Sequence, residues 1–223
     1  VDRLIARGFG VIGAARDVDA LGSVEGLESR HALDARDPDA TEALVGQLVQ
    51  EGAIHGIVNL AGCIMLKPAH LVSTADWNET LATKLTTAFS CVRAAGRHLK
   101  SGGSVVLVST VAAGTGLSNH EAIAAAGAGV EGLARAAAAT YAARGLRFNV
   151  VAPGLIDTPL ASRITGSERA LEHSRKMHPL GRIGVPEDVA PAIAWLLSED
   201  ADWVTGQTIG IDGGLGALRV PAS

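Results

Sequence analysis

Short, mostly apolar segments alternate along this chain with longer segments of helical periodicity, and this alternation is the strongest constraint on the fold. We expect the apolar segments to be strands, at Gly10–Ala15, Ile54–Asn59, Gly103–Ser109, Arg147–Val151 and Thr208–Ile211. We expect helices at Ala40–Glu51, Asp76–Leu99, Asn119–Ala143 and Pro186–Leu197. Strands without polar alternation are buried on both faces, so helices must cover both sides of a parallel sheet. The pattern therefore predicts an α/β fold built on a doubly wound parallel sheet.

The composition is that of a globular protein with a large aliphatic core. The 223 residues are 48% hydrophobic and only 3% aromatic, and the formal net charge is -4. This charge gives no reason to expect nucleic acid or a membrane surface as a partner. Cys63 and Cys91 form no CxxC motif, so we expect free thiols and no metal site. We expect a single domain over residues 1–223, with no membrane span or signal peptide and a cytoplasmic location.

Five short motifs occur in the order and spacing of one known family. They are Asn59–Gly62, Val106–Thr110, Asn149–Gly154, Thr205–Thr208 and Asp212–Gly214. Together they resemble the short-chain dehydrogenase/reductase family over nearly the whole chain. The resemblance implies a Rossmann-like sheet, a nicotinamide cofactor, and hydride transfer at a carbonyl or alcohol carbon of a small-molecule substrate.

The strand ends place a cofactor site at one edge of the expected sheet. Ligands of open parallel sheets bind outside the carboxyl ends of the strands. By resemblance to the family, Asn59, Ala61 and Gly62 would contact the cofactor after one strand. Pro153 and Gly154 would flank the nicotinamide after another. A single glycine of this set could also serve only to form a turn.

The end of the first apolar segment favours NADP over NAD. An acidic residue there would bind the ribose diol of NAD, whereas an arginine would bind the 2′-phosphate of NADP. Ala15 stands at the usual acidic place and Arg16 follows it, although Asp17 would restore NAD binding if the register shifted by one residue. Asp34 matches the family's aspartate beside the adenine, but a loop aspartate can also cap a turn.

The N-terminal end departs from the family pattern. The family begins with a strand and a Gly-rich turn whose amides hold the pyrophosphate. Neither precedes Val1, and Val1–Gly8 resembles the end of the helix that follows that turn. We therefore expect the sheet to lack its central first strand, and a cofactor to bind only if the missing N-terminal segment is present. The Gly-x-Gly-x-x-Gly run at Gly127–Gly132 lies in an Ala-rich helical segment and is not that turn.

The catalytic positions depart from the family as well. Thr110 stands at the place of the catalytic serine, Lys84 at that of an asparagine, and Ile123 and Gly127 at those of the tyrosine and lysine. Thr110 keeps a hydroxyl that can orient a substrate oxygen. Lys84 is either a replacement for the missing positive charge or a solvated helix lysine. His120, three residues before Ile123, is either a substitute proton donor or a helix cap.

Two functions stay open from these residues. The first is an NAD(P)-linked oxidoreductase with altered or lost proton-transfer groups. The second is a catalytically inactive family member that acts as a binding or partner subunit; an inert fragment of a larger gene is a third possibility. The family's use of its two long helices implies a homodimer or homotetramer, helped by small residues at Ala124, Ala128, Gly132 and Ala136. Ile156–His178 has little strand character and is expected to form a mobile lid.

Overall fold

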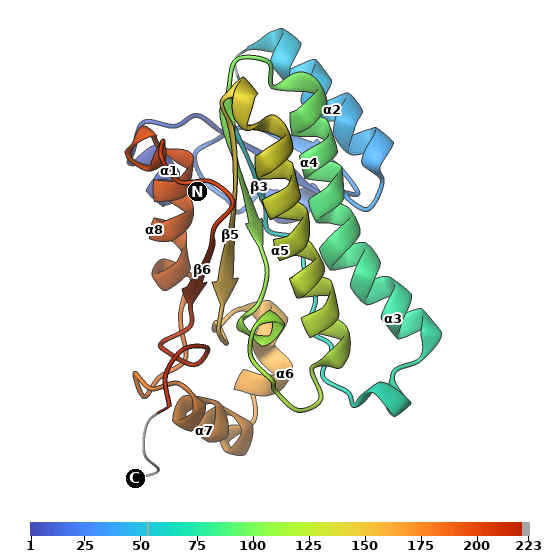
Figure 1. Ribbon diagram of the computed structural model, residues 1–223, viewed down its shortest axis with the longest axis vertical. Helices are drawn as coiled ribbons and strands as arrows, with labels where there is room; N and C mark the ends of the chain where they lie inside the picture. Colours follow the sequence, from blue (N-terminus) through green and yellow to red (C-terminus); the bar gives the residue numbers. More distant parts are fainter. Residues whose placement is uncertain (53, 220–223) are drawn as a thin grey trace.

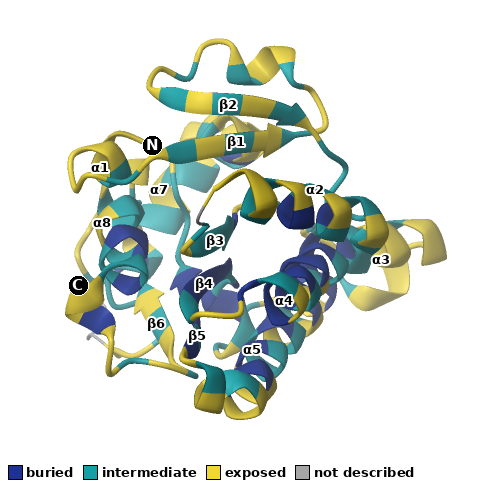
Figure 2. Ribbon diagram, turned by 90° about the horizontal axis from the view of Figure 1, so that it is seen from above, coloured by how far each residue is buried: buried dark blue, intermediate teal, exposed yellow. Residues whose placement is uncertain are grey.

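Parallel strands occupy the centre of the computed structural model, which describes residues 1–52 and 54–219 (Figure 1). A four-stranded parallel sheet has the spatial order β3 (Gly56–Asn59), β4 (Gly103–Val108), β5 (Leu146–Pro153) and β6 (Thr208–Ile211). A second parallel sheet pairs β1 (Val11–Ala15) with β2 (Leu27–Ala32). Figure 2 shows this smaller sheet at one end of the molecule, beyond β3. The parallel arrangement expected from the apolar segments is confirmed.

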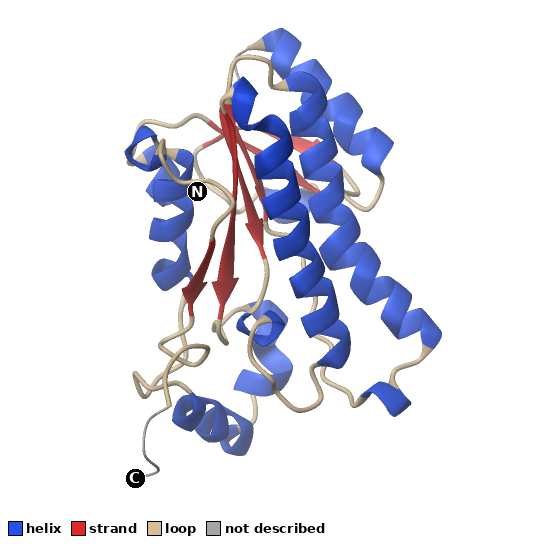
Figure 3. Ribbon diagram, in the orientation of Figure 1, coloured by secondary structure: helices blue, strands red, loops and turns tan. Residues whose placement is uncertain are grey.

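Helices cover both faces of the larger sheet (Figures 1 and 3). The main helices are α2 (Pro38–Glu51), α4 (Thr87–His98) and α5 (Glu121–Tyr141) on one face, and α8 (Pro186–Leu197) with the short α1 (Asp2–Ile5) on the other. Alternate residues of β4 face opposite sides, so Val105 and Leu107 pack with α4 and α5, whereas Val106 packs with α8. The fold is therefore the expected doubly wound, Rossmann-like α/β arrangement.

The sheet is interrupted between β1 and β3. Neither of the two hydrophobic core clusters contains a residue of β1 or β2, and Ile12 of β1 is 37% exposed. The described strands therefore form two separate parallel sheets, β1–β2 and β3–β4–β5–β6. β2 was not predicted from the sequence, because its inward side chains include Ser29 and His31, which hydrogen-bond to each other at 2.9 Å. The strand therefore contains no apolar run.

The long helix expected at Asp76–Leu99 is divided into three parts. It comprises α3 (Thr74–Leu81), a π-helical turn η3 (Ala82–Thr86), and α4. The Ser73 side chain caps the start by accepting a hydrogen bond from the Asp76 amide at 3.0 Å. The extra residue of a π-helical turn changes which side chains face inward, and such turns are frequent at functional sites. Here the turn contains the buried Lys84.

The segment expected as a lid contains two helices and no named strand. They are α6 (Ser162–Thr165) and α7 (Glu168–Met177). Neither helix has a buried residue, whereas Ala161 and His178, which flank the two helices, are 1% and 4% exposed. Short 3₁₀ turns complete the described chain, at η1 (Asp19–Leu21), η2 (Ala69–Leu71), η4 (Val111–Ala113), η5 (Ala142–Arg144), η6 (Pro159–Ala161) and η7 (Glu199–Ala201).

Candidate functional site

The carboxyl ends of β3, β4 and β5 lie at the same edge of the sheet, on the side of α6 and α7 (Figure 1). Asn59 ends β3, Thr110 follows β4, and Pro153 ends β5. In an open parallel sheet this edge is where ligands bind. The fold therefore brings together the three strand ends that the sequence motifs identified.

Thr110 and Gly127 lie in direct contact. A Cβ atom built on Gly127 would lie 2.9 Å from Thr110 Cγ2, 3.0 Å from Ser109 Oγ and 3.2 Å from Ala113 Cβ. The Thr110 hydroxyl accepts a hydrogen bond from the Ala112 amide at 3.3 Å, which fixes its rotamer at the start of η4. The threonine methyl group therefore fills the space into which a side chain at position 127 would project.

Ile123 fills the position at which the family carries its tyrosine. Its side chain is 5% exposed, and it lies on the buried face of α5 together with Gly127. An isoleucine has no proton to exchange, and its burial leaves a dry apolar surface at this place. The two positions that carry the family's proton-transfer pair are thus packed rather than open.

Lys84 is the buried cation of the site. It is 6% exposed, and its Nζ donates a hydrogen bond to the Ser109 carbonyl oxygen at 3.0 Å. A Cβ atom on Gly62 would lie 4.0 Å from the same Nζ, so the amine lies between the ends of β3 and β4. Burial lowers the pKa of the Lys84 amine from its ordinary value. Within residues 1–52 and 54–219, no carboxylate forms a salt bridge with it.

His120 occupies the N-cap position of α5. Its Nδ1 donates a hydrogen bond to the Ser118 carbonyl oxygen at 2.7 Å, across the left-handed Asn119 (φ 64°). Its side chain forms no hydrogen bond with Thr110 or Lys84 in the described part of the chain. The structure therefore brings Thr110 and Lys84 to the same strand end, whereas His120 lies at the entrance to the neighbouring helix.

The turn after β3 is held from inside the fold. Asn59 is 6% exposed; its Nδ2 donates to Thr87 Oγ1 at 3.0 Å and its Oδ1 accepts from the Ala61 amide at 3.1 Å. Both polar ends of the Asn59 side chain are therefore used within the protein. The side chain shapes the turn, and Ala61 and Gly62 present backbone and little side chain at its surface.

Gly154 is a glycine for a reason that the sequence did not show. A Cβ atom on it would lie 2.6 Å from His178 Nε2 and 3.1 Å from Asp212 Cα. Its amide also donates to the Ile211 carbonyl oxygen at 3.0 Å, next to the pairing of Pro153 with Ile211. The motif after β5 thus has a packing requirement of its own, in addition to any contact with a cofactor.

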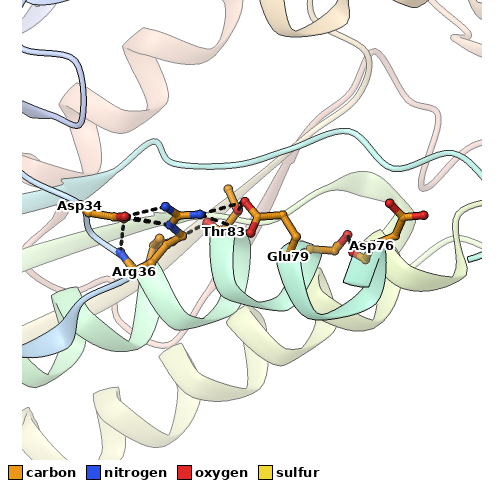
Figure 4. Close-up of polar contacts among 7 residues, drawn as sticks. Asp34, Arg36, Asp76, Glu79 and Thr83 are labelled. Carbon is orange, nitrogen blue, oxygen red and sulfur yellow. Dashed lines mark hydrogen bonds and ion pairs between the residues drawn. The ribbon is translucent and has the colours of Figure 1, made fainter. Parts of the chain in front are cut away.

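Asp34 forms a charged network with Arg36 and Glu79 (Figure 4). Arg36 contacts both Asp34 oxygens, with its Nη2 2.6 Å from Oδ2, and reaches Glu79 on α3 at 3.0 Å. Hydrogen bonds from the Arg36 side chain lower the pKa of the Asp34 carboxyl to about 2. Asp34 also accepts a hydrogen bond from the Arg36 amide at 3.0 Å, so it caps a turn as the alternative interpretation expected.

Arg16 lies exposed just after β1, close enough to Asp34 to help lower the pKa of that carboxyl. Its guanidinium forms no hydrogen bond or ion pair with the residues that the structure describes. Asp17, in contrast, accepts hydrogen bonds from the Asp19 and Ala20 amides at 3.1 and 3.3 Å. The free cation at this strand end fits a phosphate group, whereas the neighbouring carboxylate is already engaged in a turn.

The pairing of Ser109 with Glu131 was not predicted from the sequence. Ser109 is 2% exposed, and its Oγ lies 2.9 Å from Glu131 Oε1 and 3.1 Å from the Gly127 carbonyl oxygen. This hydroxyl ties the end of β4 to α5 beside Lys84. Glu131 lies four residues after Gly127 in the sequence, and that helical spacing is the signal that could have identified it.

Within residues 1–52 and 54–219 there is no group of three or more histidine, cysteine or acidic side chains placed to hold a metal ion. Cys63 and Cys91 are both free, as expected. The helices in this part of the chain are too short or too polar to cross a membrane.

Known proteins with similar sequences and structures are dehydrogenases and reductases. A family model described as enoyl-(acyl carrier protein) reductase matches residues 2–216. The cis-4-hydroxycyclohexanecarboxylate dehydrogenase of Sinomonas cyclohexanicum is 39% identical over 189 residues, which cover 83% of this chain and 75% of that protein. The 3-oxoacyl-[acyl-carrier-protein] reductase of Thermotoga maritima is 37% identical, covering 86% of this chain and 79% of the relative.

A solved structure shares the fold closely. It is a candidate NAD(P)-dependent gluconate 5-dehydrogenase of Beutenbergia cavernae, solved with NADP bound at low occupancy. The TM-score is 0.87 at 27% identity, and the match covers 97% of this chain and 90% of that chain.

Proposed function

The chain belongs to the short-chain dehydrogenase/reductase family, and on this premise we propose that it is an NAD(P)-linked oxidoreductase with altered proton-transfer residues. Its reaction is hydride transfer at a carbonyl or alcohol carbon of a small molecule. The relatives named above support a secondary alcohol or a ketone as the substrate class. The nicotinamide cofactor supplies the hydride chemistry, and the residues of this chain bind and orient the reactants.

The position of Lys84 carries the proposal. Its amine lies at the strand ends, 3.0 Å from the Ser109 carbonyl oxygen, and none of the salt bridges among the described residues involves it. A buried cation without a counterion attracts the negative charge that develops on a substrate oxygen. We assign to Lys84 the electrostatic role that Gly127 cannot fill, although the charge comes from α3–η3–α4 rather than from α5.

Thr110 has the role of orienting the substrate oxygen. Its hydroxyl accepts from the Ala112 amide, which leaves its own proton available to donate to a ligand. A hydroxyl of this type is too weakly acidic to be the proton donor. Because general acid catalysis contributes about 10²–10⁴-fold, we expect ketone reduction slower by about this factor than in relatives with the tyrosine and lysine. His120 is the remaining candidate for a proton donor.

The proposed cofactor is NADP rather than NAD, bound when the N-terminal strand and Gly-rich turn are present. The exposed Arg16 at the end of β1 supports this choice, because Asp17 is engaged with turn amides. Asp34, together with Asn59, Ala61, Gly62, Pro153 and Gly154, would line the rest of the nucleotide site at the strand ends. A charge-assisted hydrogen bond to the 2′-phosphate is worth about 1.5–3 kcal/mol, enough to set the preference.

A second candidate function is binding without chemistry. The burial of Ile123 and the filling of the space beside Gly127 by the Thr110 methyl group favour it, because both catalytic positions are closed by packing. In this role the chain would bind a nucleotide or act as a partner subunit. Binding of NADP with no turnover of any ketone would support this function over the first.

Assembly through the long helices is part of the proposal. Ala128 and Ala136 of α5 are exposed. Two large side chains of the neighbouring helices are exposed as well, Trp77 of α3 at 39% and Phe89 of α4 at 44%. Small residues on α5 let a second copy approach closely, so we propose a homodimer or homotetramer. The two free thiols support a reducing compartment, the cytoplasm.

The experiment compares ketone reduction by NADPH in three proteins, each extended at its N-terminus by a strand and a Gly-rich turn of the family type: the otherwise unmodified chain, Lys84→Met, and the control Lys100→Met. Lys100 is exposed at the end of α4, so its replacement removes an equal charge away from the site. We expect slow turnover in the unmodified protein and the control, and a further loss of about 10²-fold in Lys84→Met. Equal rates in all three proteins would remove Lys84 from the mechanism.

A gain-of-function variant complements this test. Restoring tyrosine and lysine requires room for the new side chain at position 127, so Thr110 must lose its methyl group as well. We expect the triple change Thr110→Ser, Ile123→Tyr and Gly127→Lys to raise the rate above that of the double change Ile123→Tyr and Gly127→Lys. Equal rates in the two variants would contradict the packing argument.

A further inference from the structure

The helix α7 has no buried residue of its own. Its salt bridges are internal, since Arg175 pairs with Glu168 and Glu172, and Lys176 pairs with Glu172. These pairs stabilise the helix but do not attach it to the sheet. Partly buried side chains such as Leu171 and Met177 are the only ones of the helix that can pack on the rest of the protein, so a buried attachment at either end adds to its docking.

His178, immediately after α7, provides such an attachment. Its side chain is 4% exposed, although the ten residues of the helix before it are not buried. Its Nδ1 lies 2.7 Å from the Ser174 carbonyl oxygen, and its Nε2 lies 3.3 Å from the Leu155 amide nitrogen. One ring thus contacts both the last turn of α7 and the segment that follows β5.

The two partners determine which ring nitrogen carries the proton. A carbonyl oxygen can only accept, so Nδ1 must be the donor to Ser174. A backbone amide can only donate, so Nε2 must present its lone pair to Leu155. Only the Nδ1–H tautomer of His178 satisfies both bonds, and the buried ring has no solvent to replace either partner.

Gly154 completes the arrangement. A Cβ atom there would lie 2.6 Å from His178 Nε2, so any other residue at position 154 would displace the ring. The backbone on the far side is also glycine: Gly213 would place a Cβ atom 3.6 Å from His178 Cβ, and its carbonyl oxygen accepts from the Leu180 amide at 3.1 Å. The imidazole therefore lies in a slot between two backbone segments.

We propose that His178 is a positioning residue that fastens the lid helix α7 to the Pro153–Leu155 segment, and that Gly154 is required to admit its ring. The ring sets the relative position of the lid and of the segment assigned above to the nicotinamide. In this second respect the inference rests on the proposed function. The attachment of α7 does not, so the two can be tested apart.

The test measures amide hydrogen exchange residue by residue in the unmodified protein and three variants. His178→Phe keeps a ring but removes both nitrogens. His178→Gln supplies an oxygen that can accept from the Leu155 amide. His173→Phe is the matched control, because His173 is an exposed histidine of the same helix.

We expect the Leu155 amide to exchange about two- to tenfold faster in His178→Phe, which corresponds to the loss of one hydrogen bond. The α7 amides should exchange faster with it, while the Val150 and Val151 amides of β5 stay protected. His178→Gln should restore protection at Leu155, and the control should change neither segment. Unchanged exchange at Leu155 in His178→Phe would overturn the proposal.

Two further measurements cover the remaining outcomes. If His178→Phe does not fold, the nitrogen-15 spectrum of the unmodified protein tests the attachment by His178. A proton on Nδ1 and a lone pair on Nε2 support the attachment, and the opposite tautomer refutes it. Titration with NADP tests the consequence for the cofactor, for which we expect several-fold weaker binding in His178→Phe. If NADP does not bind even to the protein extended by the N-terminal strand and Gly-rich turn, the proposed function fails while the exchange result on α7 still stands.

Discussion

Replacing Gly127 with alanine tests whether the space of the missing lysine side chain is closed. Alanine is about 1 kcal/mol more favourable than glycine in a helix interior, so an unopposed change at this position of α5 would stabilise the protein. The new methyl group, however, would lie 2.9 Å from Thr110 Cγ2 and 3.0 Å from Ser109 Oγ. Thr110 is β-branched and its hydroxyl caps η4, so it cannot rotate away cheaply. Overpacking of this kind costs about 1–3 kcal/mol.

The two effects leave Gly127→Ala between about neutral and 2 kcal/mol less stable than the unmodified protein. Gly132 on the same helix is the control, because a Cβ atom there meets nothing within 4 Å. Gly132→Ala should therefore gain about 1 kcal/mol. Urea unfolding followed by circular dichroism measures both, at several protein concentrations so that altered subunit association is recognised.

A change in the partner residue identifies the cause. In a Thr110→Ser background the 2.9 Å contact is absent, and Gly127→Ala should become about 1 kcal/mol less costly. Stabilisation of Gly127→Ala equal to that of Gly132→Ala would refute the closed packing. So would the same cost for Gly127→Ala with serine or threonine at position 110.

Other predictions concern charge and assembly. Because burial lowers the pKa of Lys84, its ammonium form destabilises the native state at neutral pH. Lys84→Met should therefore raise the free energy of unfolding at pH 7, and this gain should shrink as the pH rises toward 10.5. The pKa of the Asp34 carboxyl should be near 2 by NMR and should rise toward 3.8 in Arg36→Gln. As the pH falls from 3.8 to 2, the protein should lose at most about 1 kcal/mol of stability, because both side chains are partly exposed. Arg16→Ala should weaken NADP by about tenfold or more and NAD much less in titration calorimetry; equal losses would show that Arg16 does not bind the phosphate. Light scattering at micromolar concentration should give the mass of a dimer or tetramer, and a monomer mass would contradict the proposed helix interface.

The fold could be predicted wherever buried positions form an apolar run or a helical repeat in the sequence. β4 and β5 are mostly apolar, with Val105–Val108 and Val150–Ala152 as unbroken apolar runs, and their strand assignment follows from these runs. The long helix α5 was predicted within two residues at each end, since Gly145 closes the turn after it in a left-handed conformation (φ 70°). β2 was missed because its inward face is polar, and the π-helical turn η3 leaves no signal in hydrophobic periodicity.

The residues of the candidate site could be named from the sequence, but the contacts between them could not. The spacing of the motifs identified Thr110, Lys84, Ile123 and Gly127 as the positions to examine. That the Thr110 methyl group fills the space beside Gly127 depends on how β4 and α5 approach each other, which no local pattern encodes. The engagement of Asn59 with Thr87 and the contact of Gly154 with His178 are likewise long-range contacts. Sequence alone could only name those residues as turn or cofactor positions.

The break between the two sheets has a consequence for cooperativity. The β1–β2 unit shares no residue with either core cluster, and exposed ion pairs such as Arg36 with Glu79 and Arg7 with Asp200 link its flanks to the rest. Such pairs contribute about 0–1 kcal/mol each and weaken in salt. In a protein of residues 1–223 alone, this end of the molecule should therefore open as a separate unit before global unfolding. Any ligand that contacts both sheets must then use part of its binding energy to hold the two sheets together. The affinity of such a ligand therefore depends on how stably the sheets dock.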